Sequence, residues 1–353
     1  MNVNDCRPLV ELTRGDLIES IHFGAFVVVD SKGRVLASEG NPDLLTYPRS
    51  SMKPFQALPF IERNGAEAFD FSPQEIAIMC ASHSGTDSHM QVLEGMHQKI
   101  GTHEDDLACG VHWPGDEKTR VALQIAGEKP TAFRHNCSGK HTGMLAQARL
   151  SGWPIEDYLD PQHPVQVRIR EVLAEMVEMD PDDMPLGVDG CSAPVYGIPL
   201  RKMALGIAKL ADPVALGKDR AAACQKITSA MRSHPEMVAG PGKFDTMLMS
   251  AAGGSVLSKG GAEGYQVIGI MPGVIKAGSS GIGVAIKISD GDVQGRARAA
   301  VGIHLLKALG VLEQEQLEDL HPFGFGPVVN WRKLVVGEMR PSFSVAQLEE
   351  MIY

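Results

Sequence analysis

The chain has 353 residues, 44% of them hydrophobic and 22% charged, and its formal net charge at pH 7 is -10. This composition is typical of a globular protein that is long enough to enclose a site within a substantial core. The acidic balance, the lack of a lysine- or arginine-rich block and the 5% aromatic content argue against a nucleic-acid-binding or membrane-binding surface. The sequence has no 18-residue apolar run and no signal-peptide pattern, which predicts a cytoplasmic protein.

Six cysteines are scattered along the chain, and no two of them form a Cys-x-x-Cys pair. We therefore expect free thiols in a reducing compartment. Metal ligation is the one special role that this pattern leaves open.

Strand signals stand near both ends of the sequence. Residues 25–30 and 34–39 are rich in β-branched side chains and flank a turn sequence, which predicts a hairpin. Three further strands are expected at 255–259, 265–270 and 281–288, and a helix is expected at 293–309.

Helical patterns dominate the middle of the chain. Ser72 and Glu75 have the spacing of a capping box, and Asp160-Pro161 is expected to open a helix. The apolar face of that second helix is Val165, Ile169, Leu173 and Met176. We predict one sheet-containing domain formed by residues 1–50 with 251–353, and an inserted, mainly helical domain formed by residues 51–250.

A serine and a lysine stand three residues apart where a helix is expected to begin. Ser50 and Lys53 would share one face of that helix, and Pro54 is tolerated only in a first turn. Backbone N–H groups at a helix N-terminus face developing negative charge, so Ser50 could act as a nucleophile with Lys53. One Ser-x-x-Lys match is weak evidence, and the alternative is a solvated lysine in an ordinary helix.

A second cluster, residues 80–85, follows the capped helix. Ser82 could relay a proton between a nucleophile and an amine, because a hydroxyl both donates and accepts. The alternative is a plain helix C-terminus with Gly85 in the left-handed conformation. No Gly-x-Ser-x-Gly elbow surrounds any serine, so we interpret His83 as structural.

A third cluster joins residues 135–141 with residues 189–194. Gly139-Lys140 is similar to part of a phosphate-binding loop, but the preceding glycine is absent and His141 replaces the serine or threonine, which argues against nucleotide binding. Cys137 and Cys191 could hold zinc, although free buried cysteine is the commoner case.

Together these segments resemble the asparaginase II family, the rhizobial-type class of L-asparaginases, which is similar in fold to serine β-lactamases, penicillin-binding proteins and serine glutaminases. The matching segments are residues 19–24, 48–54, 81–85, 136–141, 188–191 and 259–264. The resemblance implies an α/β (α+β) fold, with an antiparallel five-stranded sheet flanked by helices and an inserted helical domain. It also implies a homodimer.

Site residues follow from the same resemblance. It implies Ser50 as nucleophile with Lys53, assisted by Ser82 and Lys259. It also implies a zinc ion held by Cys137, Lys140 and Cys191. Asp189 and His141 would lie near this ion. At four positions the residue differs from the one usual in the family. Phe23 stands in place of arginine, His135 in place of asparagine, Ser51 in place of alanine and Ser192 in place of glycine.

The expected chemistry is hydrolysis of L-asparagine to L-aspartate and ammonia. Lys53 must be neutral part of the time to accept the proton of Ser50, and a second cation at Lys259 would favour that neutral form. Backbone N–H groups near Ser50 and Ala262 would hold the oxyanion. Arg49 and Lys259 are candidate partners of the substrate α-carboxylate, although Arg49 could equally be a structural ion-pair residue.

Two other classes of function stay open. A glutaminase or a β-lactam-cleaving serine hydrolase would share the serine and both lysines but would not need the two-cysteine cluster. A non-enzymatic binding or sensor domain could retain a serine that is acylated without turnover.

Overall fold

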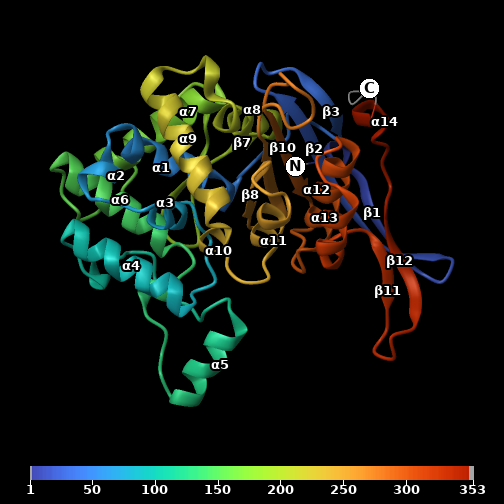
Figure 1. Cartoon of the computed structure of the whole chain (residues 1–353), viewed down its shortest axis with the longest axis horizontal. Helices are drawn as coiled ribbons and strands as arrows, with labels where there is room; N and C mark the ends of the chain where they lie inside the picture. The colour runs from blue at the N-terminus through green and yellow to red at the C-terminus, as the bar shows by residue number, and fades with distance from the viewer. Residues whose placement is uncertain (1, 350–353) are drawn as a thin grey trace. The chain divides into compact units, whose positions relative to one another are not determined.

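The computed structural model describes residues 2–349, which divide into two compact units (Figure 1). Unit 1 contains residues 2–48, 198–212 and 247–349, and unit 2 contains residues 49–197 and 213–246. The sequence pattern predicts that residues 198–212 belong to the helical insertion. They group with unit 1, because the helix that they form packs on the sheet.

Unit 1 is built on an eight-stranded sheet in which the paired strands are antiparallel. The strand order is β11-β12-β1-β2-β10-β9-β8, and β3 pairs with β2 beside this path. Its strands are β1 (Arg7–Arg14), β2 (Leu17–Asp30), β3 (Val35–Glu39), β8 (Val256–Gly261), β9 (Tyr265–Ile270), β10 (Ile282–Ile288), β11 (Gly326–Val329) and β12 (Val335–Pro341). Two short strands, β4 (Leu45–Thr46) and β7 (Ile198–Pro199), pair separately.

Helices cover both faces of the sheet's centre. All seven residues of β10 are buried, and successive strand side chains point to opposite faces, so neither face of this strand meets solvent. Two helices pack on β10, namely α8 (Leu200–Ala211) and α12 (Arg296–Ala308). The absence of a side chain at Gly283 permits the close approach of α8, since a Cβ there would lie 1.9 Å from the Ala204 carbonyl oxygen. The other helices of unit 1 are α13 (Gln314–Asp319) and α14 (Ala346–Glu349).

This architecture confirms the predicted mixed α/β class with an antiparallel sheet flanked by helices. The predicted hairpin is β2–β3, and the three later strands are β8, β9 and β10. The sheet has eight strands where five were expected, because β1, β11 and β12 escaped detection. Charged residues, prolines and glycines dilute the apolar alternation in these strands, and β11 and β12 contain no fully buried residue.

Unit 2 is mainly helical and is organised around α1 (Lys53–Glu62). Nine consecutive residues of this helix, 53–61, are buried, because α6, α7 and α9 all pack against it. The helix α5 stands apart from the other helices of the unit (Figure 1). The other elements are α2 (Gly65–Ala68), α3 (Pro73–Met79), α4 (Asp87–Ile100), α5 (Glu117–Ala126), α6 (Ser138–Ser151), α7 (Pro164–Val177), β5 (Leu186–Val188), β6 (Pro194–Tyr196), α9 (Lys218–Ser233) and α10 (Pro235–Val238). The chain returns from unit 2 to unit 1 for the last time within α11 (Phe244–Ala251).

The predicted capping box is present at the start of α3, where Ser72 and Glu75 each bond the other's backbone N–H. The second predicted helix begins at Pro164, with His163 as its N-cap, and not at Asp160-Pro161. Its four predicted apolar side chains are buried. Within residues 2–349, no helix has the length and apolar character needed to cross a membrane.

Candidate active site

Ser50 and Lys53 lie on either side of a junction between two kinds of helix. Ser50 belongs to a 3-10 turn, Arg49–Met52, and Lys53 is the first residue of α1. Pro54 is accommodated in the first turn of α1, where its missing N–H leaves no intrahelical bond unmade. Ser50 is partly exposed, whereas Lys53 is only 1% exposed.

The buried amine of Lys53 is held by oxygen atoms from two loops. Its Nζ atom donates to the Ala81 carbonyl oxygen at 2.5 Å and lies 3.0 Å from Ser82 Oγ. A third, longer contact of 3.4 Å reaches the Asn136 carbonyl oxygen. The structure therefore brings Lys53 and Ser82 together. The two carbonyl partners had no signal in the sequence, since every residue has a carbonyl.

The loop that carries Ser82 begins where α3 ends, at Cys80. The Ser82 N–H donates to the Val238 carbonyl oxygen at 2.9 Å, which anchors the loop. His83 is buried; its Nε2 atom lies 2.8 Å from Ser138 Oγ and its Nδ1 atom accepts the Gly85 N–H. Burial holds the pKa of His83 well below its usual value. These contacts match the structural role predicted for this histidine.

Arg49 and Asp189 form an ion pair, with Arg49 Nε 2.7 Å from Asp189 Oδ1. The backbone of Arg49 has a φ of 51°, a left-handed conformation that costs a non-glycine residue energy. The pair ties the strained turn before Ser50 to the loop of residues 189–193. Ser192, in the same loop, has a φ of 69°, a conformation that favours glycine. The sequence leaves Arg49 open as a partner of the substrate α-carboxylate or as a structural ion-pair residue. In the structure its side chain forms an ion pair with Asp189.

The three predicted metal ligands converge at the N-terminus of α6. Cys137 is the N-cap of this helix, and Lys140 lies in its first turn with Nζ 2.8 Å from Cys191 Sγ. The Cys191 thiol also forms a hydrogen bond with Cys137. All three side chains are at least 96% buried.

The pKa values of the three side chains in this cluster shift in different directions. The hydrogen bond from Cys191, followed by the nearby lysine charges, lowers the pKa of Cys137 well below that of a free thiol. The same hydrogen bond and burial raise the pKa of Cys191. Burial would lower the pKa of Lys140, but Cys137 and Cys191 outweigh it and the net direction is upward.

Two buried cysteine sulfur atoms are ligands that fit zinc, whereas the amine of Lys140 can bind a metal only in its neutral form. Within residues 2–349, no three histidine, cysteine, aspartate or glutamate side chains form a group that could hold a metal ion. A zinc ion at the Cys137–Lys140–Cys191 cluster would therefore depend on the lysine as its third protein ligand.

His141 lies one residue beyond Lys140 and is fully buried. Its Nδ1 atom is 2.6 Å from the Tyr158 hydroxyl, which also accepts the Ala108 N–H. Burial lowers the pKa of His141 well below its usual value. Among the residues that the structure describes, its Nε2 atom has no hydrogen-bond partner, so a neutral ring with its proton on Nε2 has an unused donor.

Lys259 and Ala262 belong to unit 1. Lys259 lies on β8, fully buried, with Nζ donating to the Gly260 carbonyl oxygen at 2.7 Å. Ala262 is exposed in the turn between β8 and β9. Their proximity to Ser50 stays a prediction.

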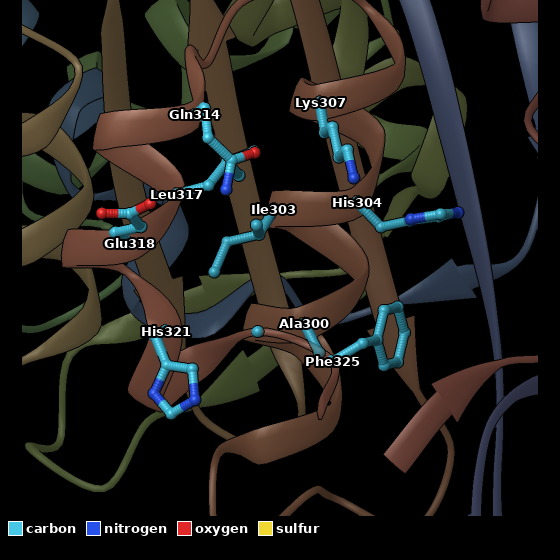
Figure 2. A pocket seen from close by; sticks show the side chains of 10 residues that line it. Ala300, Ile303, His304, Lys307, Gln314, Leu317, Glu318, His321 and Phe325 are labelled. Carbon is cyan, nitrogen blue, oxygen red and sulfur yellow. The ribbon is translucent and has the colours of Figure 1, made fainter. Parts of the chain in front are cut away.

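A cavity of 390 Å³ also lies in unit 1, between α12 and α13 (Figure 2). Polar side chains of Lys307, Gln314, Glu318 and His321 surround an apolar floor that includes Ile303. None of the predicted site residues lines it. It offers no serine or cysteine nucleophile, so the candidate active site is the one built around Lys53.

Comparisons with known proteins agree with the sequence-based resemblance. The sequence model of the L-asparaginase II family matches residues 10–341. No curated protein matches the chain. Among solved structures, the chain is similar to a probable glutaminase from Bacillus subtilis complexed with 6-diazo-5-oxo-L-norleucine, at 13% identity and a TM-score of 0.40 over 82% of this chain and 85% of that one. A Bacillus glutaminase in the presence of 4.3 M NaCl has 13% identity and a TM-score of 0.36 over 82% and 91%.

Proposed function

The chain belongs to the L-asparaginase II family and is an amidohydrolase, and from this premise we propose that it hydrolyses L-asparagine to L-aspartate and ammonia through an acyl-enzyme on Ser50. The observation that supports this mechanism is the 3.0 Å contact between the buried Lys53 Nζ and Ser82 Oγ, since Lys53 lies three residues after Ser50 in the chain. A buried amine with a hydroxyl partner can move a proton without the help of bulk water.

The reaction proceeds in two steps. Lys53 takes the proton of Ser50, whose Oγ atom bonds to the carboxamide carbon of the substrate, and the oxyanion accepts hydrogen bonds from backbone N–H groups near Ser50 and Ala262. Ser82 relays the proton to the leaving nitrogen, the C–N bond breaks and ammonia departs. Water then attacks the ester carbon, the C–Oγ bond breaks, and aspartate and free Ser50 are released.

Recognition of the amino-acid end of the substrate is assigned to residues around the loop of residues 189–193. The unused Nε2 donor of His141 and the remaining oxygen of Asp189 are available for polar groups of the substrate, and Arg49 keeps Asp189 in place. Lys259 would pair with the α-carboxylate by a charge-assisted bond.

Cys137, Lys140 and Cys191 would hold a zinc ion beside this site. When bound, the ion would supply a fixed positive charge and would order the two loops that carry the ligands. The acyl transfer itself depends on Ser50 and Lys53. A homodimer and a cytoplasmic location also belong to this proposal, and sedimentation and cell fractionation would test them.

The decisive experiment measures ammonia release from asparagine and glutamine, and hydrolysis of nitrocefin, with wild type and Ser50→Ala in parallel. We expect asparagine to be the best substrate and Ser50→Ala to lower its kcat by roughly a thousandfold or more while the protein stays folded. Ser51→Ala is the matched control, because Ser51 has no lysine three residues later, and it should keep most of the activity. Near wild-type turnover by Ser50→Ala would overturn the serine mechanism. A clear preference for glutamine would overturn the substrate assignment.

A further inference from the structure

Two histidine rings hold the turn that precedes α6. His112 Nε2 accepts the backbone N–H of Asn136 at 3.0 Å, and His135 Nδ1 accepts the backbone N–H of Cys137 at 3.0 Å. The two rings are in contact, with centroids 4.3 Å apart. The backbone N–H groups of two successive residues, Asn136 and Cys137, therefore each donate to an imidazole nitrogen.

These contacts define how each ring must be arranged. A backbone N–H can only donate, so the nitrogen that faces it must be the unprotonated acceptor of a neutral ring. For His112 the proton is then on Nδ1, which lies 2.7 Å from the Trp113 carbonyl oxygen and donates to it. For His135 the acceptor is Nδ1 and the proton is on Nε2. His112 thus accepts a backbone N–H through Nε2, whereas His135 accepts one through Nδ1.

The peptide group between Asn136 and Cys137 connects this arrangement to Lys53. In a trans peptide the N–H and the carbonyl point in opposite directions within one plane. The N–H of this group is held by His135, and its carbonyl oxygen faces Lys53 Nζ at 3.4 Å. Fixing the N–H on one side therefore aims the carbonyl oxygen at the amine on the other. The preceding peptide group, held by His112, restricts rotation of the same turn.

We propose that His112 and His135 are positioning residues of the active site, which act through the backbone of Asn136 and Cys137 to aim a carbonyl oxygen at Lys53. This role rests on the proposed function of Lys53 as the base that activates Ser50. The carbonyl oxygens of Ala81 and Asn136 keep the amine oriented between proton transfers. Loss of either imidazole acceptor frees a peptide group to rotate and leaves Lys53 less well oriented, so the effect falls on the chemical step.

Amide side chains provide a crossed test, because their oxygen atoms mimic different imidazole nitrogens. The oxygen of asparagine lies near the position of Nδ1, and that of glutamine reaches the position of Nε2. His112→Gln and His135→Asn thus retain the acceptor that each site needs. His112→Asn and His135→Gln misplace it and serve as matched controls of the same chemistry.

We expect the two matched variants to stay within about threefold of the wild-type kcat, and the two mismatched variants to lose about tenfold, with a smaller change in KM. Hydrogen–deuterium exchange of the 135–138 segment gives a readout that does not depend on catalysis. The mismatched variants should expose the Asn136 or Cys137 amide to faster exchange while their thermal unfolding stays close to that of the wild type.

Mismatched variants that keep both wild-type kcat and wild-type amide protection would overturn the proposal. A uniform loss of kcat and of thermal stability in all four variants would also overturn it, since it would mean that the rings only fill space. If the wild type releases no ammonia from any substrate, the proposed function fails by itself. The exchange pattern then decides whether the rings hold the turn, and unchanged protection in the mismatched variants rejects that role.

Discussion

The Nζ atom of Lys53 lies 3.0 Å from the Oγ atom of Ser82, although the two residues are 29 positions apart in the chain. Lys53 opens α1, and Ser82 follows the end of α3, so the contact joins two helix termini of unit 2. The neighbouring Ser84 is buried, but its Oγ atom has no hydrogen-bond partner among the described residues. One loop therefore offers a serine that contacts the amine and a serine that does not.

Ser82→Ala should lower the kcat for asparagine by roughly tenfold to a hundredfold, because the proposed proton relay between Lys53 and the leaving nitrogen would be lost. Ser84→Ala should leave kcat within about threefold of the wild type, since no hydrogen bond is lost. Steady-state ammonia release from asparagine, measured for both variants, gives the two kcat values that test this prediction. Equal kcat values for both variants would remove Ser82 from the mechanism.

Gly139 lies where α6 meets α3, and a Cβ atom at this position would come within 2.1 Å of the Ile78 carbonyl oxygen. Gly139→Ala should therefore destabilise the protein by about 2 kcal/mol or more, because backbone atoms must move. Gly95→Ala in α4 is the control; its Cβ would have no neighbour closer than 3.9 Å, and alanine is the better helix former. Urea unfolding of both variants measures the difference. Equal stability of the two would show that α6 can move away from α3 at little cost.

Local signals account for the parts of the fold that the sequence predicted. The β2–β3 hairpin, the Ser72 capping box and the buried face of α7 each depend on residues close together in the chain. The start of α7 was placed too early, because His163 caps that helix and histidine is not a usual capping residue. The strands β11 and β12 went undetected because their pairing partners and their half-exposed faces give no regular alternation.

In the site, side-chain chemistry was visible in the sequence and backbone partners were not. Lys53 and Ser82 belong to recognisable motifs, whereas the Ala81 and Asn136 carbonyl oxygens could be identified only from coordinates. Two departures from the usual family residues also gain a physical explanation. The left-handed φ of Ser192 suits the glycine usual there, and an asparagine oxygen could accept the Cys137 N–H that His135 accepts here.

Acid should destabilise the protein through its buried histidines. Burial lowers the pKa of His97 to about 4, and its two ring nitrogens lie 3.0 Å from Thr142 Oγ1 and 2.8 Å from Thr102 Oγ1. The unfolded chain binds a proton at this ring near pH 6.5 and the folded chain does not, so stability is lost as the pH falls from about 6.5 towards 4. For a shift of this size the loss is roughly 3 kcal/mol.

Urea unfolding between pH 7 and pH 4.5 tests this prediction. His97→Gln should have a shallower fall of unfolding free energy with decreasing pH than the wild type, because one proton-linked group is removed. His321→Gln changes an exposed histidine and should keep the wild-type slope. Identical slopes for wild type and His97→Gln would mean that other groups cause the acid sensitivity.

Zinc binding to the cluster of Cys137, Lys140 and Cys191 should depend steeply on pH. The raised pKa values of Cys191 and Lys140 mean that these two groups hold protons near neutral pH, whereas the lowered pKa of Cys137 makes its proton easier to remove. Coordination by all three requires two protons to leave. Affinity should therefore rise about a hundredfold for each pH unit between pH 7 and pH 8, and it should be modest at neutral pH.

Competition with a chromophoric zinc chelator under reducing conditions measures this affinity. Cys137→Ser should abolish stoichiometric binding and raise KM for asparagine more than it lowers kcat, because in the proposed mechanism the metal would order the loops that orient the substrate while Ser50 would supply the nucleophile. Cys224→Ser, in a buried cysteine of α9, should bind zinc as the wild type does. Reduced wild type that binds no zinc at pH 8 would return both cysteines to the role of free thiols. A complete loss of turnover with chelator, reversed by added zinc, would make the metal essential, and kcat rather than KM would then respond to Cys137→Ser.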